Sequence, residues 1–262
     1  MTFKRGAGNW CPAAVLGAVL GAALTLAPGA AGAQSASNRT IIEHFNIIAF
    51  GNEYTGRRYG HVRKWRAPIT ARIDGDPPAF FEDFVSQHLA DLAKITGHPM
   101  SLAYSARMQR EKRVAKGLTP KSFNMFLLFY PMDEMAAVVR KQLGPRMDHE
   151  LKLLAAGKAT CMARFFTRDN EIRTAVILFP ATHPKQYLRA CVVEELTQVL
   201  GLPNDSNSVK PSIFNDQSRY FELTGHDRRM LKMLYDPRIT PGMPRQEALR
   251  QGRLILDEMT QR

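Results

Sequence analysis

The chain has 262 residues, of which 45% are hydrophobic and 23% are charged, so it is long enough to bury a sizeable hydrophobic core. Its formal net charge of +12 favours anionic partners such as lipid headgroups, acidic glycans or nucleic acid. No nucleic-acid-binding motif accompanies the charge, which argues against a specific nucleic-acid partner and makes a solvated basic face the simpler interpretation.

The first 33 residues have the pattern of a secretory signal peptide. Lys4 and Arg5 form a basic start, residues 13–26 are apolar, and Ala31 and Ala33 form an A-x-A cleavage signal. An uncleaved membrane anchor is the alternative, but the apolar run is shorter than the roughly 20 residues that a spanning helix needs. We therefore expect cleavage near Ala33, no transmembrane segment in the mature chain, and a location in the periplasm or outside the cell.

The first half of the mature chain contains four predicted strands and one long helix. Apolar runs and alternation predict strands at residues 45–50, 69–73, 100–104 and 123–130. Pro77 and Pro78 start an amphipathic helix whose apolar residues recur at helical spacing up to Ile95, and Gly97 is its stop signal. Residues 51–60 are predicted as a loop, and residues 107–121 as a basic excursion.

The second half is predicted to contain a pair of strands between helices. Residues 132–143 and 148–156 are helical, and residues 161–168 and 171–179 are antiparallel strands joined by a tight turn at Asp169 and Asn170. The motif helix follows Pro184 and runs to Gly201, and residues 223–235 and 244–259 are closing helices. This order predicts one α+β domain over residues 34–262, with a mixed sheet, a long N-terminal helix, the motif helix and a C-terminal helical tail at 241–262.

Two cysteines, Cys161 and Cys191, remain after the predicted cleavage. An oxidising compartment would allow them to form a disulfide between a strand and the start of the motif helix. Two buried thiols are the alternative, because the sequence does not show whether the Cα atoms come within about 7 Å of each other. We expect the disulfide.

Residues 194–204 have the frame of a zinc-peptidase active-site helix in which the zinc ligands are replaced. In metzincin-type peptidases a helix supplies two His four residues apart with a catalytic Glu after the first, a Gly ends the helix, and a third ligand follows three residues later. The ligand positions here are Glu194, Gln198 and Asn204, whereas the general-base position is Glu195 and the bend is Gly201.

This spacing predicts a polar patch on one side of the helix. At 3.6 residues per turn, Glu194 and Gln198 project from one face with Glu195 alongside. We expect Gly201 to redirect the chain so that Asn204 or Asp205 returns toward Gln198. The alternative is an ordinary solvated helix face that ends in a glycine C-cap.

The oxygen ligands of this patch are poorly suited to zinc. Glu and Gln in place of imidazoles make a harder and weaker ligand set, which matches Ca²⁺, Mg²⁺ or Mn²⁺ better than Zn²⁺. We expect no bound zinc and no cofactor, with a weak divalent cation as the alternative.

Two later stretches extend the resemblance to zincins across residues 190–235. Residues 211–215 resemble the metzincin Met-turn, with Phe214 in place of the Met, although Phe214 also suits a core position. Residues 223–227, followed by Leu234 and Tyr235, resemble the helix that closes the matrix-metalloproteinase catalytic domain. Thr224 suits a helix cap, so a structural role for the neighbouring His226 is the expectation. Together these stretches imply a zincin-like, metzincin-like fold.

The chain also resembles an uncharacterised family of exported proteobacterial proteins, the domain of unknown function 2927. The resemblance covers most of the mature chain and is carried by residues 191–198, 201–205, 212–216 and 234–238. It implies export and a zincin-related fold, and it brings no established activity, substrate or partner.

Three functions fit these features. The first is a non-catalytic zincin-like binding domain that holds an extended peptide or an envelope component beside an edge strand, with Glu194, Gln198, Asn204 and Asp205 in its cleft. The second is an atypical metal-dependent hydrolase or peptidase that uses Glu195 as general base. The third is an envelope or membrane-surface protein whose basic run at 107–121 binds anionic lipid or polysaccharide. Loss of the zinc ligands favours the first.

Overall fold

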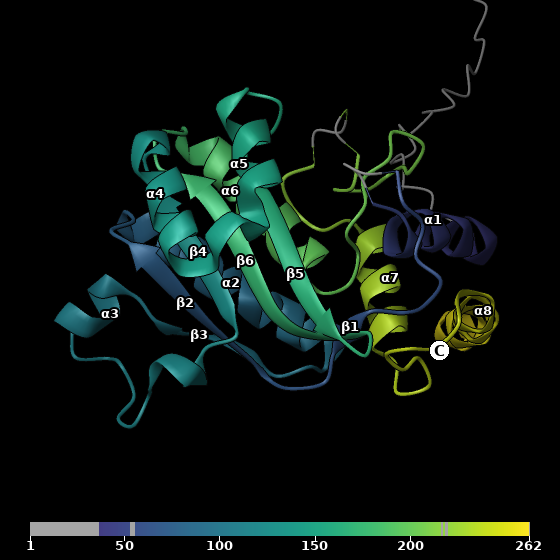
Figure 1. The fold of residues 1–262 in the computed structure, drawn as a ribbon. Helices are drawn as coiled ribbons and strands as arrows, with labels where there is room; N and C mark the ends of the chain where they lie inside the picture. The colour runs from purple at the N-terminus through teal and green to yellow at the C-terminus, as the bar shows by residue number, and fades with distance from the viewer. Residues whose placement is uncertain (1–36, 53–55, 216, 218–219, 262) are drawn as a thin grey trace, which may run out of the picture. The chain divides into compact units, whose positions relative to one another are not determined.

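A mixed sheet lies at the centre of the computed structural model, which describes residues 37–261 apart from 53–55, 216 and 218–219 (Figure 1). The predicted signal peptide lies outside the described residues. The strand order is β1-β6-β4-β2-β3, and β5 pairs with the other side of β6. The strands are β1 (Lys64–Trp65), β2 (Ile69–Gly75), β3 (Met100–Tyr104), β4 (Met125–Tyr130), β5 (Met162–Arg168) and β6 (Glu171–Pro180).

All strand pairs in this sheet are parallel except the hairpin of β5 and β6. The hairpin turns at Asp169 and Asn170, whose φ angles of 54° and 62° are left-handed, as a two-residue type I′ turn requires. The tight turn predicted from the sequence is confirmed. The mixed sheet is confirmed as well, but its parallel centre gives the fold more of an α/β character than the predicted α+β class implies.

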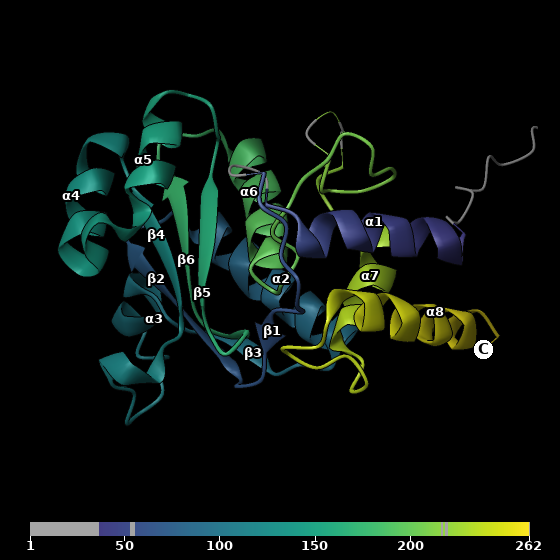
Figure 2. The ribbon, with the colours of Figure 1, turned by 45° about the vertical axis from the view of Figure 1, so that its right-hand side comes forward.

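The central strands are buried on both faces because helices cover both sides of the sheet (Figures 1 and 2). In β4, Leu127 belongs to one core cluster and Leu128 to the other, and Ile177 and Leu178 of β6 divide in the same way. Alternation between two buried faces explains why these strands are continuous apolar runs. One face carries α4 (Met132–Leu143) and α5 (Asp148–Ala155), and the other carries α2 (Ala79–Thr96) and α6 (Lys185–Gln198).

The predicted strand at residues 45–50 is wrong, because these residues end helix α1 (Asn38–Phe50). Ser37 caps the helix by accepting a hydrogen bond from the amide of Thr40 at 3.2 Å. Ile41, Phe45 and Ile48 then follow at helical spacing and are fully buried. A six-residue apolar window does not separate a buried strand from the buried end of a helix.

The other predicted elements occur close to their expected bounds. Helix α2 starts after Pro78 and ends at Gly97, whose φ of 68° is left-handed, as expected for a glycine C-cap. Residues 144–147 form a short 3-10 helix between α4 and α5, and the basic excursion contains a one-turn helix and a 3-10 turn. The remaining helical elements are α3 (Ala106–Arg110), η1 (Pro120–Ser122), η2 (Gly144–Met147), α7 (Gly225–Tyr235) and α8 (Arg245–Gln261).

The short strand β1 anchors the C-terminal ends of two helices. The indole N–H of Trp65 donates to the carbonyl of Val199 at the end of α6 at 2.8 Å. The buried ammonium of Lys64 donates to the carbonyls of Leu234 and Ile239, at the end of α7 and just beyond it, at 2.9 and 2.7 Å. Burial lowers the pKa of Lys64 to about 8. These bonds satisfy carbonyls that lack partners within a helix.

Cys161 and Cys191 form a disulfide, with their Cα atoms 5.9 Å apart. The bridge predicted from the sequence is confirmed, and it joins the start of β5 to the middle of α6. The edge strand of the sheet is therefore covalently held beside the motif helix.

Among the described residues, no helix is both long and apolar enough to span a membrane.

Candidate functional site

The polar residues of the motif lie on the second half of α6, which is largely enclosed, whereas the first turn of the helix is exposed. Glu195 and Gln198 of α6 are only 6% and 8% exposed, and Glu194 is half-buried. The solvated helix face, which was the alternative to a site, is therefore wrong for Glu195 and Gln198. A carboxylate is seldom buried in this way unless it is paired or functional, because removing it from water is costly.

The end of α6 requires the glycine that the motif provides. The helix ends at Gln198, three residues before Gly201, to which it was expected to run, and the amide of Gly201 donates to the carbonyl of Gln198 at 3.1 Å. Gly201 has a left-handed φ of 117°, and a Cβ at this position would lie 2.1 Å from the carbonyl oxygen of Arg63. Any side chain here would clash with the backbone, so the bend depends on glycine.

The bend brings Asp205 back to α6, whereas Asn204 contacts a different helix. The amide nitrogen of Gln198 donates to a carboxylate oxygen of Asp205 at 2.9 Å. The amide nitrogen of Asn204 donates to the carbonyl of Ile47 near the end of α1 at 3.1 Å. The expected return toward Gln198 is thus made by Asp205. Both amides donate through nitrogen, which fixes their orientation and leaves the amide oxygen of each as the atom that could bind a cation.

Within the part of the chain that the structure describes, no group of three or more His, Cys, Asp or Glu side chains is placed to hold a metal ion.

The turn at residues 212–214 is fixed by a buried carboxylate of α7. Asp227 is fully buried and accepts hydrogen bonds from the hydroxyl of Ser212 at 2.5 Å and the amide of Ile213 at 3.2 Å. It also accepts from the amide and hydroxyl of Thr224, which caps α7. Burial raises the pKa of Asp227, and these four bonds act against that rise. The predicted Thr224 cap is confirmed.

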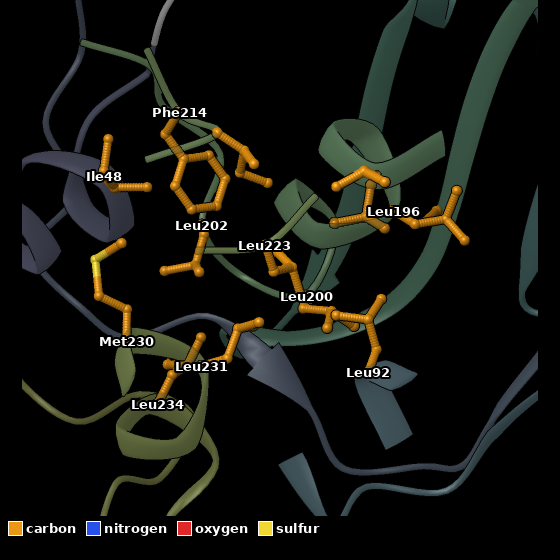
Figure 3. Packing of buried hydrophobic residues seen from close by; sticks show 14 of the residues in the cluster. Ile48, Leu92, Leu196, Leu200, Leu202, Phe214, Leu223, Met230, Leu231 and Leu234 are labelled. Carbon is orange, nitrogen blue, oxygen red and sulfur yellow. The ribbon is translucent and has the colours of Figure 1, made fainter. Parts of the chain in front are cut away.

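Phe214 is a core residue. It is fully buried and lies among Ile48, Leu202 and Leu223, between α1 and the end of the motif helix (Figure 3). The core interpretation of Phe214 is therefore confirmed.

Sequence reasoning missed the contact between His226 and His44. The Nε2 atom of His226 lies 3.0 Å from Nδ1 of His44, on α1, so one ring donates to the other. Burial, followed by the charges of His44 and Arg229, lowers the pKa of His226 to about 4. No local signal marks this pair, because the two residues are 182 positions apart.

The basic run at 107–121 uses its arginines to attach itself to the domain. Arg107 pairs with Asp83 at 3.2 Å, and Arg110 pairs with Asp76 at 3.2 Å. Arg113 pairs with the buried Glu82 at 3.2 Å. Arginines that neutralise acids of the same chain add little to a surface for anionic ligands, so the structure gives little support to the lipid or polysaccharide function.

Comparison with curated proteins and with solved structures finds no match to the chain. A scan against family models does find a match, to the model described as protein of unknown function (DUF2927), and it extends over residues 38–252. This range includes every element from α1 to the first half of α8. The chain therefore belongs to the DUF2927 family.

Proposed function

We propose that this protein is an exported, zincin-like binding domain that has lost catalysis and holds an extended peptide. The proposal rests on the residues that stand at the positions of the metzincin zinc ligands and on what their side chains contact. Gln198 and Asn204 both direct amide N–H groups at acceptors within the protein, Asp205 and the Ile47 carbonyl. Each amide is therefore oriented by a hydrogen bond within the protein, and its oxygen atom is a neutral and weak ligand in place of the imidazole that zinc prefers.

The edge strand β5 supports peptide binding. It pairs with β6 alone among the described strands, it is antiparallel to its neighbour, and the disulfide holds its start against α6. An extended peptide can add to such an edge through main-chain hydrogen bonds, while pockets beside it select alternate side chains.

Export is part of the proposal. The signal-peptide pattern of residues 1–33 supports it, and so does the disulfide, since such bonds persist in oxidising compartments. Both features favour the periplasm or the extracellular space.

A second candidate function is a metal-dependent hydrolase with Glu195 as general base and a hard cation held by Glu194, Gln198 and Asn204. The burial of Glu195 favours it, because an acid enclosed on a central helix is typical of a functional site. In this case the amide oxygens of Gln198 and Asn204 would have to reach the cation together with Glu194, while their nitrogens keep their present acceptors.

The zincin-like frame can be tested by restoring its ligands. We expect the wild-type protein to contain no stoichiometric zinc and to show no chelator-sensitive peptidase activity. The double variant Glu194→His and Gln198→His should bind one zinc, because two imidazoles one turn apart would lie beside the carboxylate of Asp205. Elemental analysis and zinc titration measure both results.

The matched control is the pair Glu247→His and Gln251→His on α8, which changes the same residue types at the same spacing. We expect the motif variant to bind zinc at least about 100-fold more tightly than this control, since a third ligand is available only at the motif. Equal affinities would count against the zincin-like frame. One tightly held zinc in the wild type, with activity lost in Glu195→Gln, would instead establish the second candidate.

The binding function needs a separate test. We expect selection from a library of ten-residue peptides to yield ligands that bind in extended form. N-methylation of alternate backbone amides should abolish binding when the methylated amides face β5, and should have little effect when they face away. Deuterium exchange should slow at β5 in the complex. Ligands that tolerate methylation at every position, or protection confined to another surface, would contradict binding at this edge.

A further inference from the structure

A cavity opens beside α6, on the side of the helix that faces α2. It encloses about 110 Å³ between α2, α6 and the start of α7. Its α6 residues are Arg189, Val192 and Val193. At about 100° per residue, Arg189 and Val193 lie across the helix from Gln198, whereas Val192 lies on the same side as Glu195. The motif residues Glu194, Glu195 and Gln198 do not line the cavity.

The cavity has an apolar interior and a charged mouth. Val192, Val193 and Leu223 are buried and Phe84 is half-buried, whereas the charged lining residues are exposed. Arg189 pairs with Glu222 and stacks 5.3 Å from the ring of Phe84. The charged lining residues are Asp91, Arg189, Glu222 and Arg228.

The interior contains one polar side chain, His88 of α2, which is 7% exposed. Its Nε2 atom lies 3.1 Å from both the carbonyl oxygen of Val193 and the hydroxyl oxygen of Thr197. A carbonyl only accepts hydrogen bonds, so Nε2 carries the proton and Nδ1 carries a lone pair. Among the described residues, no hydrogen bond to this Nδ1 atom is found.

The ring of His88 is neutral at neutral pH, because burial lowers its pKa to about 4. The cavity therefore presents a neutral acceptor between apolar walls. Its natural complement is a ligand with a flat apolar body and one hydrogen-bond donor at its tip.

We infer that this cavity binds a phenol, with the ring between Phe84 and the two valines and the hydroxyl group donating to Nδ1 of His88. A cationic donor fits less well, because Arg228 lies close enough for its charge to act on His88. The mixed charges at the mouth suit polar substituents on the far side of the ring. This function is additional to peptide binding at β5 and does not depend on it.

The test compares p-cresol with 4-methylanisole, which has the same ring but no donor. For so small a fragment we expect a Kd for p-cresol of roughly 1 mM. The ether should bind about tenfold more weakly, because the lone pair of Nδ1 is then buried without a donor. Nitrogen-15 NMR of the purified protein should show that p-cresol, and not the ether, shifts the Nδ1 resonance of His88.

Two variants distinguish the effect of losing the hydrogen-bond acceptor from the effect of losing space in the cavity. In His88→Phe neither ring nitrogen remains and the ring shape is kept, so p-cresol should bind as weakly as the ether. Leu223→Phe narrows the cavity and should weaken both ligands. His98→Gln, outside the cavity, should change neither affinity. Equal affinities of the two ligands for the wild type would overturn the inference, as would p-cresol shifts elsewhere or no binding up to its solubility limit.

Discussion

The free energy of unfolding should fall by roughly 5 kcal/mol as the pH is lowered from 6.5 to 4. Burial lowers the pKa of both His88 and His226 to about 4 in the folded protein. The unfolded chain keeps the ordinary value of about 6.5, so it binds more protons than the folded chain throughout this interval. Protonation therefore favours unfolding as the pH falls, and the effect is absent above pH 6.5.

Urea unfolding at several pH values measures this loss, and NMR titration of the imidazole resonances assigns it. His88→Gln should reduce the loss of unfolding free energy between pH 6.5 and 4 by roughly 3 kcal/mol. The same change at the exposed His149 should leave this loss unchanged. The pKa of Asp227 is raised in the folded protein, so its protonation stabilises the fold as the pH falls. Comparing the histidine variant with the wild type cancels this contribution and leaves that of the histidine. An unfolding free energy that stays constant between pH 6.5 and 4.5 would contradict the prediction.

The substitution Asp227→Ala should destabilise the protein by about 3–5 kcal/mol. It removes the acceptor of four hydrogen bonds and leaves the Ser212 hydroxyl and the amides of Ile213 and Thr224 without this acceptor, whereas the Thr224 hydroxyl also donates to the carbonyl of Pro211. It also removes the side chain that accepts from the Thr224 amide in the capping box of α7. Asp227→Asn should have an intermediate effect, because one of its two terminal groups still accepts.

Chemical denaturation measures this change, and Asp76→Ala is the control. Asp76 is exposed and pairs with Arg110 on the surface, so its loss should change stability by less than about 1 kcal/mol. A loss of similar size in both variants would show that the Asp227 network contributes no more than a surface ion pair. In that case the turn at residues 212–214 is held mainly by the packing of Phe214.

Helix α6 contributes residues both to the enclosed motif and to the cavity beside α2. It carries the enclosed Glu195 and the bond between Gln198 and Asp205, and it lines the cavity that contains His88. The disulfide at Cys191 and the hydrogen bond from Trp65 to Val199 hold the helix at its middle and its end. A helix fixed in this way can present a precise surface to a ligand without large rearrangement.

The sequence alone determined the elements that depend on local signals. Helix α2 was predictable because Pro78 and Gly97 mark its ends and its apolar residues follow one face. The hairpin turn was predictable because Asp169 and Asn170 tolerate left-handed backbone angles. Gly201 was identifiable as the bend, although only the structure shows the clash with Arg63 that makes glycine necessary.

The tertiary structure decided everything that depends on burial and on distant partners. The apolar run at 45–50 is helical because residues before it, beginning with the Ser37 cap, continue the same buried face. The contact of His44 with His226 and the bond of Asn204 to Ile47 join segments with no relation in sequence. Whether a polar helix face is solvated or enclosed depends on which elements pack over it, and a one-dimensional pattern does not contain that information. For this reason the sequence located the motif on α6, whereas the structure showed that Glu195 and Gln198 are buried and that Asp205 is the residue that returns to Gln198.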